Sequence, residues 1–125
     1  MCKGLNPVEG SFAKRRTDPL RVLFICSRNR RRSPTAERVF SERHDLEVLS
    51  AGLAPDAEEV VTAEMLEWAD MIFVMEKFHR ARLQRRFGPH IRRRRIVCLD
   101  IADKYAFMDE ALVELIEARV TPLLR

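Results

Sequence analysis

Long apolar runs are missing from this 125-residue chain, and no segment approaches the length that a membrane-spanning helix needs. Cysteine is scarce: Cys2, Cys26 and Cys98 lie far apart in the sequence, which predicts a reducing compartment and no disulfide framework. The first residues lack the apolar core of a secretory signal. These absences predict a cytoplasmic protein without a membrane partner.

Metal-ligand spacing is also missing, because His44, His79 and His90 are isolated from one another and from the cysteines. We expect all three to be surface residues and expect no metal ion or other cofactor. Aromatic residues are not interleaved with the arginines, which disfavours a platform for stacking single-stranded nucleic acid.

Positive charge is abundant, with a net charge of +4 and a pI near 9.3, and this favours acidic partners without naming them. The arginines concentrate at 28–32, 80–86 and 92–95. We interpret the last cluster as a solvated loop, and nucleic acid is not the expected partner.

The chain alternates short apolar runs with helical patterns after a first segment, 1–20, that we expect to be a flexible tail. Residues 21–125 then form one domain, predicted to be an α/β fold with a four-stranded parallel sheet and helices on both faces. The predicted strands are 21–26, 46–51, 70–75 and 95–101. The predicted helices are 33–43, 61–69, 77–87 and 108–120, the third ended by Gly88-Pro89 and the last burying Ala111, Leu112, Leu115, Ile116 and Val120.

The stretch from Cys26 to Pro34 carries the strongest chemical signal of the chain. It reads Cys-Ser-Arg-Asn-Arg-Arg-Arg-Ser-Pro and follows a buried strand directly. Ser33 is predicted to cap a helix that has Pro34 in its first position. A strand, a turn and a helix N-terminus form an anion site, in which Arg32 offers a fork for two phosphate oxygens and positive charge favours the thiolate form of Cys26.

At these residues the chain resembles the low-molecular-weight protein tyrosine phosphatase family, whose loop reads Cys, five residues, Arg, Ser or Thr, usually then Pro. Further likenesses are the strand-ending Ser50-Ala51-Gly52, the third strand 70–75, and a fourth strand followed by Asp103-Lys104-Tyr105, where the family usually has Asp-Pro-Tyr. The resemblance covers about residues 21–123. It implies the strand order 2-1-3-4, which brings the loops after the first and fourth strands to one edge of the sheet.

The resemblance also implies roles for single residues in hydrolysis of a phosphotyrosyl protein or a small aryl phosphate through a cysteinyl-phosphate. Cys26 would be the nucleophile, Arg32 the phosphate clamp and Asp103 the general acid, with Asp100 as the alternative acid. Tyr105 would form an aromatic pocket wall, or else be a half-buried tyrosine of the fold. The phosphate-binding loop would consist of Ser27, Arg28, Asn29, Arg30, Arg31 and Ser33.

Three departures from the family pattern stand out. The stretch between Gly52 and Asp70 is short, Arg28 and Arg31 occupy positions where the family often has glycine and a second cysteine, and Lys104 replaces the proline after the acid. Two alternatives therefore stay open. One is an arsenate reductase of the same fold, which needs further cysteines for a disulfide relay. The other is a non-catalytic module that binds phosphate or nucleic acid.

Overall fold

Four parallel strands in the order β2-β1-β3-β4 form the centre of the protein in the computed structural model, which describes residues 18–124. The strands are β1 (Leu20–Cys26), β2 (Leu46–Gly52), β3 (Met71–Val74) and β4 (Arg95–Cys98). The helices are α1 (Arg32–Phe40), α2 (Ala63–Trp68), α3 (Lys77–Ile91) and α4 (Glu110–Val120), followed by a short 3-10 helix at Thr121–Leu123. The predicted fold class and strand order are confirmed.

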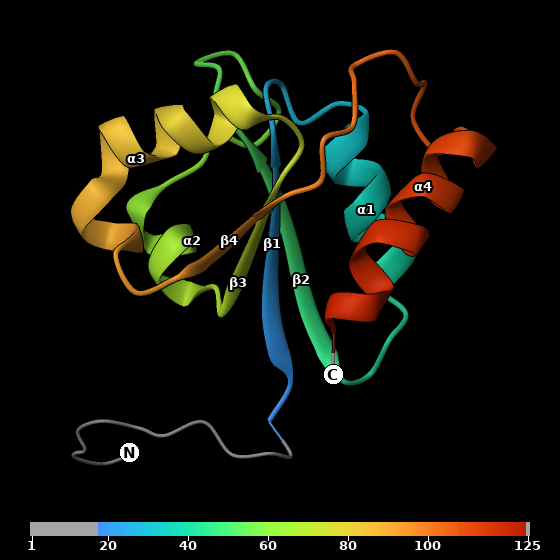
Figure 1. The fold of residues 1–125 in the computed structure, drawn as a ribbon, viewed down its shortest axis with the longest axis horizontal. Coiled ribbons are helices and arrows are strands. Elements are labelled where there is room, and N and C mark those ends of the chain that lie inside the picture. The colour runs from blue at the N-terminus through green and yellow to red at the C-terminus, as the bar shows by residue number, and fades with distance from the viewer. Residues whose placement is uncertain (1–17, 125) are drawn as a thin grey trace.

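Helices cover both faces of the sheet (Figure 1), with α1 and α4 on one side and α2 and α3 on the other. Alternate residues of β1 explain this, because Val22 and Phe24 join the core with α1 and α4, whereas Leu23 and Ile25 join the core with α2 and α3. All four are fully buried. A strand that is apolar on both faces belongs inside such a three-layer fold.

The register of the sheet brings the loops that follow all four strands to one edge. Cys26, the last residue of β1, pairs with Gly52 at the end of β2, and Ile25 pairs with Val74 at the end of β3. Beyond β4, the Ile101 amide donates to the carbonyl of Met75, which carries the following loop to the same edge. These loops lie together at the top of Figure 1.

Several predicted boundaries are wrong by a few residues. Helix α1 begins at Arg32 and ends at Phe40. Ser33 is therefore not its cap, because its hydroxyl bonds side chains of the preceding loop instead. Strand β4 ends at Cys98, before Asp100 takes a left-handed φ of 58°. Helix α4 begins at Glu110, because the Asp109 carboxylate caps it by accepting from the Ala111 amide.

Gly88 and Pro89 do not end α3, contrary to the sequence prediction. The helix kinks at Phe87, where φ is −131° and ψ is 23°, and then continues to Ile91. Pro89 lies near the start of the new helical piece, where a missing N–H costs little. Ala111 is also placed differently from the prediction, since α4 buries Leu112, Ile116 and Val120 at a spacing of four and leaves Ala111 exposed.

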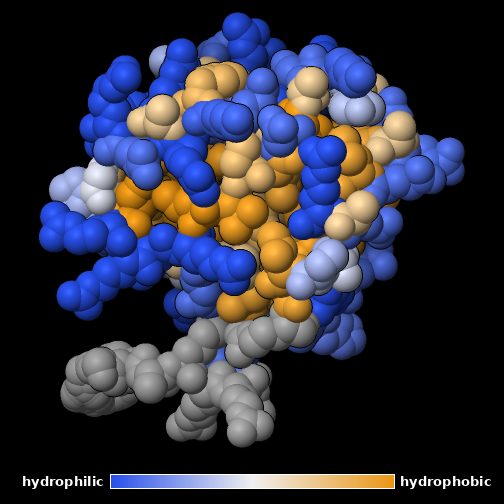
Figure 2. Space-filling model, viewed as in Figure 1, coloured by the Kyte–Doolittle hydropathy of each residue, from blue (hydrophilic) through white to orange (hydrophobic). Residues whose placement is uncertain are grey.

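Of the predicted tail, residues 1–17 lie outside the described residues, and Leu20 already belongs to β1. No helix among residues 18–124 is long and apolar enough to cross a membrane. Figure 2 shows apolar surface gathered in the middle of one face, where β4 crosses the view in Figure 1, with hydrophilic residues around it.

Candidate active site

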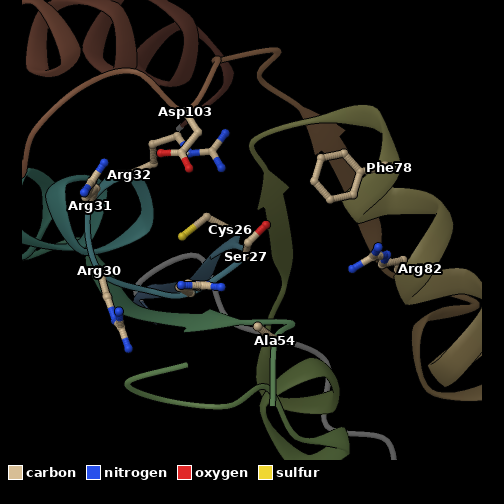
Figure 3. A pocket seen from close by; sticks show the side chains of 10 residues that line it. Cys26, Ser27, Arg30, Arg31, Arg32, Ala54, Phe78, Arg82 and Asp103 are labelled. Atoms are coloured by element: carbon tan, nitrogen blue, oxygen red, sulfur yellow. The ribbon is translucent and has the colours of Figure 1, made fainter. Parts of the chain in front are cut away.

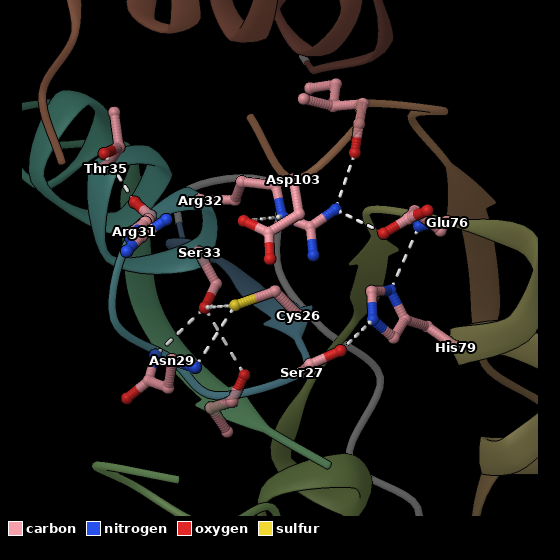
Figure 4. A network of polar contacts seen from close by, with 12 residues as sticks. Cys26, Ser27, Asn29, Arg31, Arg32, Ser33, Thr35, Glu76, His79 and Asp103 are labelled. Atoms are coloured by element: carbon pink, nitrogen blue, oxygen red, sulfur yellow. Dashed lines mark hydrogen bonds and ion pairs between the residues drawn. The ribbon is translucent and has the colours of Figure 1, made fainter. Parts of the chain in front are cut away.

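Cys26 ends β1 with its sulfur inside a tight loop that leads into α1. The residue is 3% exposed. Its Sγ lies 2.9 Å from Oγ of Ser33 and accepts from the backbone N–H of Asn29 at 3.2 Å. Both contacts are shown in Figure 4. The sulfur thus lies within hydrogen-bonding distance of one hydroxyl and one backbone N–H inside the loop.

Asn29 gives this loop its shape. Its φ of 57° is left-handed, a region that asparagine enters more readily than most residues. Its Nδ2 donates to Oγ of Ser33 at 3.0 Å and to Oγ of Ser50 on β2 at 2.9 Å, and the Ser50 hydroxyl donates to the Glu37 carboxylate on α1. The side chains of Ser50 on β2 and Glu37 on α1 thus hold the loop in place. No local sequence pattern predicts this role for either residue.

Gly52 allows β2 to approach the loop at close range. A Cβ at this position would lie 2.5 Å from the Ser27 carbonyl oxygen, 2.7 Å from Cβ of Ala57 and 3.0 Å from the Asn29 amide nitrogen. Such distances are below van der Waals contact, so only glycine fits without moving the loop.

Arg32 is buried, with 3% of its side chain exposed. Its Nη1 donates to the Glu76 carboxylate at 2.7 Å and to the Ile101 carbonyl at 2.6 Å, while its Nε lies 3.8 Å from Oδ1 of Asp103. Two acceptors hold one nitrogen of the guanidinium and orient the group. The edge formed by Nε and Nη2 has the geometry that pairs with two oxygens of an anion, and Nε of this edge faces the Asp103 carboxylate.

His79 is fully buried, so the prediction of a surface histidine is wrong. Glu76 and His79 form a reciprocal capping box at the start of α3, which turns the imidazole back under the loop. The Glu76 amide donates to Nδ1 at 3.0 Å, so Nε2 carries the proton and donates to the Ser27 hydroxyl at 2.9 Å. The three-residue spacing from Glu76 to His79, directly after an apolar strand, is the signal that could have identified this pair.

Burial, together with the positive charge of Arg32, lowers the pKa of His79 from 6.5 to about 4, although Glu76 opposes the shift. The imidazole is therefore neutral at pH 7 and acts as a fixed hydrogen-bond donor to Ser27. This links the loop after β1 to the start of α3 (Figure 4).

A cavity of about 530 Å³ opens above the Cys26 sulfur. The residues that line it come from the loop after β1, the start of α3 and the loops after β2 and β4: Cys26, Ser27, Arg28, Arg30, Arg31, Arg32, Ala54, Phe78, Arg82 and Asp103. Figure 3 shows Cys26 and Ser27 between the Arg30–Arg31 side and the Phe78–Arg82 side, with Asp103 near Arg32. Asn29 and Ser33 lie against the Cys26 sulfur and support the loop.

The structure brings Asp103 to the cavity and keeps Asp100 and Tyr105 outside its lining. Asp100 is exposed, and its carbonyl accepts from Arg119 on α4. Tyr105 packs half-buried against the core next to α1 and α4, with Lys104 Nζ 5.6 Å from its ring centroid. Of the two roles expected for Tyr105, the structure therefore supports the half-buried tyrosine of the fold. The aromatic residue of the lining is Phe78, the second residue of α3 and 52 positions after Cys26, too far along the chain for the sequence pattern to connect the two.

The site combines a thiol, a guanidinium and a carboxyl group around one cavity at a helix N-terminus. The first N–H groups of a helix have no acceptor within it and attract anions. This arrangement can bind a tetrahedral anion, present sulfur to its central atom and supply a proton to a departing oxygen.

The model of the family described as low molecular weight phosphotyrosine protein phosphatase matches residues 21–82. A search of curated protein sequences found no match. Among solved structures, the chain is similar to Wzb from Vibrio vulnificus in complex with benzylphosphonate, with 25% identity, a TM-score of 0.67, and coverage of 83% of this chain and 96% of that one.

Two further structures have the same fold. The tyrosine phosphatase AmsI from Erwinia amylovora is 25% identical, with a TM-score of 0.65 and coverage of 81% of this chain and 88% of that one. The arginine phosphatase YwlE from Geobacillus stearothermophilus is 22% identical, with a TM-score of 0.68 and coverage of 84% of this chain and 93% of that one.

Proposed function

The chain belongs to the low-molecular-weight phosphotyrosine protein phosphatase family and is a phosphoric monoester hydrolase, and from this premise we propose that it removes phosphate from tyrosine through a cysteinyl-phosphate intermediate. The observation that carries the proposal is the position of the Cys26 sulfur at a cavity that Arg32 and Asp103 also line. Nucleophile, phosphate clamp and acid are thus within reach of one phosphoryl group.

In the first step the Cys26 thiolate attacks phosphorus, so an S–P bond forms while the bond from phosphorus to the phenolic oxygen breaks. Arg32 and the amides at the start of α1 stabilise the equatorial oxygens, where the charge of the transition state is spread. The Asp103 carboxylic acid protonates the departing phenolic oxygen, which leaves the tyrosine neutral.

In the second step water attacks phosphorus and gives its proton to the Asp103 carboxylate. The S–P bond breaks, which releases inorganic phosphate and restores the thiolate. The Ser33 hydroxyl, 2.9 Å from the Cys26 sulfur, stabilises the departing thiolate by donating a hydrogen bond. Protons and electron pairs balance over the cycle without a cofactor.

Phe78 supports an aryl phosphate as the substrate. It lines the cavity with 43% of its surface exposed, and an exposed phenyl ring at the entrance can pack against the tyrosine ring. A thiol nucleophile also has to stay reduced, which supports a location in the cytoplasm.

The arsenate reductase alternative has less support. It needs a second thiol that can reach the nucleophile. Of the two cysteines within residues 18–124, Cys98 packs with the core next to α2 and α3, whereas Cys26 packs with the core next to α1 and α4. The thiols therefore belong to opposite faces of the sheet.

The test is hydrolysis of p-nitrophenyl phosphate and of a phosphotyrosyl peptide by the wild type and by Cys26→Ser, with Cys98→Ser as the matched control. We expect Cys26→Ser to lose turnover but keep binding inorganic phosphate, because the anion site is mostly backbone, and we expect Cys98→Ser to remain active. Wild-type-like turnover by Cys26→Ser would falsify the cysteinyl-phosphate mechanism. Hydrolysis of phosphoarginine in place of phosphotyrosine would reassign the substrate.

A further inference from the structure

Four arginines line the mouth of the Cys26 cavity in addition to Arg32: Arg28, Arg30, Arg31 and Arg82. All four are exposed, and Asp103 is the only carboxylate among the described residues of the lining. Transfer of the phosphoryl group needs only Arg32, so this arginine rim has no role in the mechanism above. From its position at the cavity mouth, the rim can bind a part of the substrate other than the phosphate.

We propose that the arginine rim is a second anion-binding subsite, and that the preferred substrate is a phosphotyrosine with acidic residues on both sides in its peptide chain. This proposal rests on the proposed function and names the substrate class of the same site. Guanidinium groups suit the task because they pair with planar carboxylates in a bidentate geometry.

The rim has two sides. Arg30 and Arg31 belong to the loop before α1, whereas Arg82 lies on α3 with its guanidinium carbon 5.3 Å from the centroid of the Phe78 ring. Figure 3 shows these sides across the cavity from each other, with Cys26 between them. A phosphotyrosine ring that enters beside Phe78 therefore leaves the residues before it facing one side and the residues after it facing the other.

Existing ion pairs determine which rim arginines are available. Arg28 lies 4.0 Å from Asp56 and Arg30 lies 3.4 Å from Glu58, both in exposed pairs that exchange partners at low cost. Neither Arg31 nor Arg82 forms an ion pair with a carboxylate of residues 18–124. Within the described part of the chain, each side of the cavity thus holds one guanidinium without a carboxylate partner.

The distribution of the other basic residues favours a short acidic peptide over a nucleic acid. Residues 92–95 follow the far end of α3, about 20 Å from its first turn at 1.5 Å per residue. Arg94 is engaged there with the carbonyls of Leu66 and Glu67. Asp56 and Glu58 lie at the edge of the rim, where they would repel a continuous phosphate backbone. The arginines of the cavity mouth therefore form a cluster separate from the one at 92–95.

The experiment compares phosphotyrosyl peptides of one length that carry two Glu, two Gln or two Lys on each side of the phosphotyrosine. The readout is the ratio of kcat/KM for the Glu peptide to that for the Gln peptide. Exposed charge contacts contribute about two- to fivefold each, so we expect a wild-type ratio of about ten that falls as salt is added.

Two double variants with the same loss of charge separate local contact from general attraction. Arg31→Gln with Arg82→Gln should bring the ratio close to one. Arg85→Gln with Arg93→Gln, which removes two exposed arginines outside the cavity lining, should leave the ratio near its wild-type value. Glu58→Gln should raise the ratio of kcat/KM for the Glu peptide to that for the Gln peptide, because Arg30 loses the carboxylate that competes with the peptide.

The proposal is overturned if the wild type treats the Glu and Gln peptides alike at low salt, or if both double variants lower the ratio equally. It is also overturned if a 5′-phosphorylated oligonucleotide competes better than the Glu peptide. Hydrolysis of p-nitrophenyl phosphate is measured in parallel, since its absence in the wild type counts against the proposed function alone. In that case calorimetric binding of the same peptides to Cys26→Ser still tests the rim.

Discussion

At the scale of single residues, Asp103 and Asp100 are a matched pair of carboxylates. They are three positions apart in one loop and both exposed. Asp103 lines the cavity and lies 3.8 Å from Nε of Arg32, while the left-handed turn at Asp100 points the chain toward α4, where the Asp100 carbonyl meets Arg119. Of the two, Asp103 is the carboxylate that lines the cavity, which favours it as the acid of the proposed mechanism.

We predict that Asp103→Asn lowers kcat for phenyl phosphate by about 10²- to 10⁴-fold, the usual contribution of general acid catalysis, and affects p-nitrophenyl phosphate far less. The more acidic nitrophenol leaves without a proton, so the loss depends on the leaving group. Asp100→Asn is the control and should match the wild type on both substrates. If Asp100→Asn shows the dependence on the leaving group instead, the acid is Asp100.

At the scale of elements, the end of β2 and the phosphate-binding loop form one unit. Gly52 contributes by its lack of a side chain, and Ser50 by accepting from Asn29. The loop therefore depends on a neighbouring strand as well as on its own sequence. Any change that moves β2 away from β1 should disturb anion binding before it disturbs the rest of the sheet.

We predict that Gly52→Ala lowers the free energy of unfolding by about 1–3 kcal/mol through overpacking and weakens the binding of inorganic phosphate. Gly88→Ala is the matched control, because a Cβ at Gly88 meets nothing within 4 Å, and alanine is favoured over glycine in a helix. Urea unfolding and calorimetric phosphate titration of both variants measure the two effects. A Gly52→Ala protein with wild-type stability and phosphate affinity would refute the close-approach argument.

At the scale of the whole molecule, the network around His79 joins segments that are distant in the chain. His79 bonds Ser27 after β1 and Glu76 after β3, Glu76 holds Arg32 on α1, and Arg32 bonds the Ile101 carbonyl after β4. Folding is needed to bury this histidine. Its titration therefore reports on the global stability of the fold.

We predict that this histidine makes stability depend on pH between about 6.5 and about 4. An unfolded histidine takes a proton near pH 6.5, whereas folded His79 stays neutral down to about pH 4. Acid thus favours the unfolded state in this window, so the contribution of His79 is complete above pH 6.5 and is lost as the pH falls to 4. The difference between the two pKa values corresponds to roughly 3 kcal/mol in the free energy of unfolding.

Urea unfolding of the wild type and of His79→Asn across this pH range gives the measurement. Asparagine can still accept from the Glu76 amide but does not titrate. The free energy of unfolding of the variant should therefore change less between pH 6.5 and pH 4 than that of the wild type, by roughly 3 kcal/mol. The charged neighbours Arg32, Glu76, Arg82 and Asp103 are common to both proteins, and their effect largely cancels in the comparison. Parallel pH profiles for the two proteins would mean that His79 is protonated alike in both states.

Features that depend on residues close together in the chain follow from the order of the amino acids. Apolar runs without strict alternation predicted strands buried on both faces, and the Cys26-to-Pro34 stretch predicted an anion loop, because strand end, turn and helix start follow one another within nine positions. Boundaries within this loop were less predictable. The Ser33 hydroxyl could cap a helix or bond a sulfur, and only the folded loop selects between these partners.

The surroundings of that loop depend on the packing of segments that are distant in the chain. Because β3 pairs with β1, α3 starts beside the loop. Phe78 and Arg82 therefore line the cavity, and Glu76 and His79 bond Arg32 and Ser27. A pattern of residue types along the chain does not show how close α3 lies to the loop after β1. The same packing places Asp103, and not Asp100, in the lining of the cavity. Local sequence specifies conformation over a few residues, whereas contacts between distant segments depend on how buried surfaces pack together.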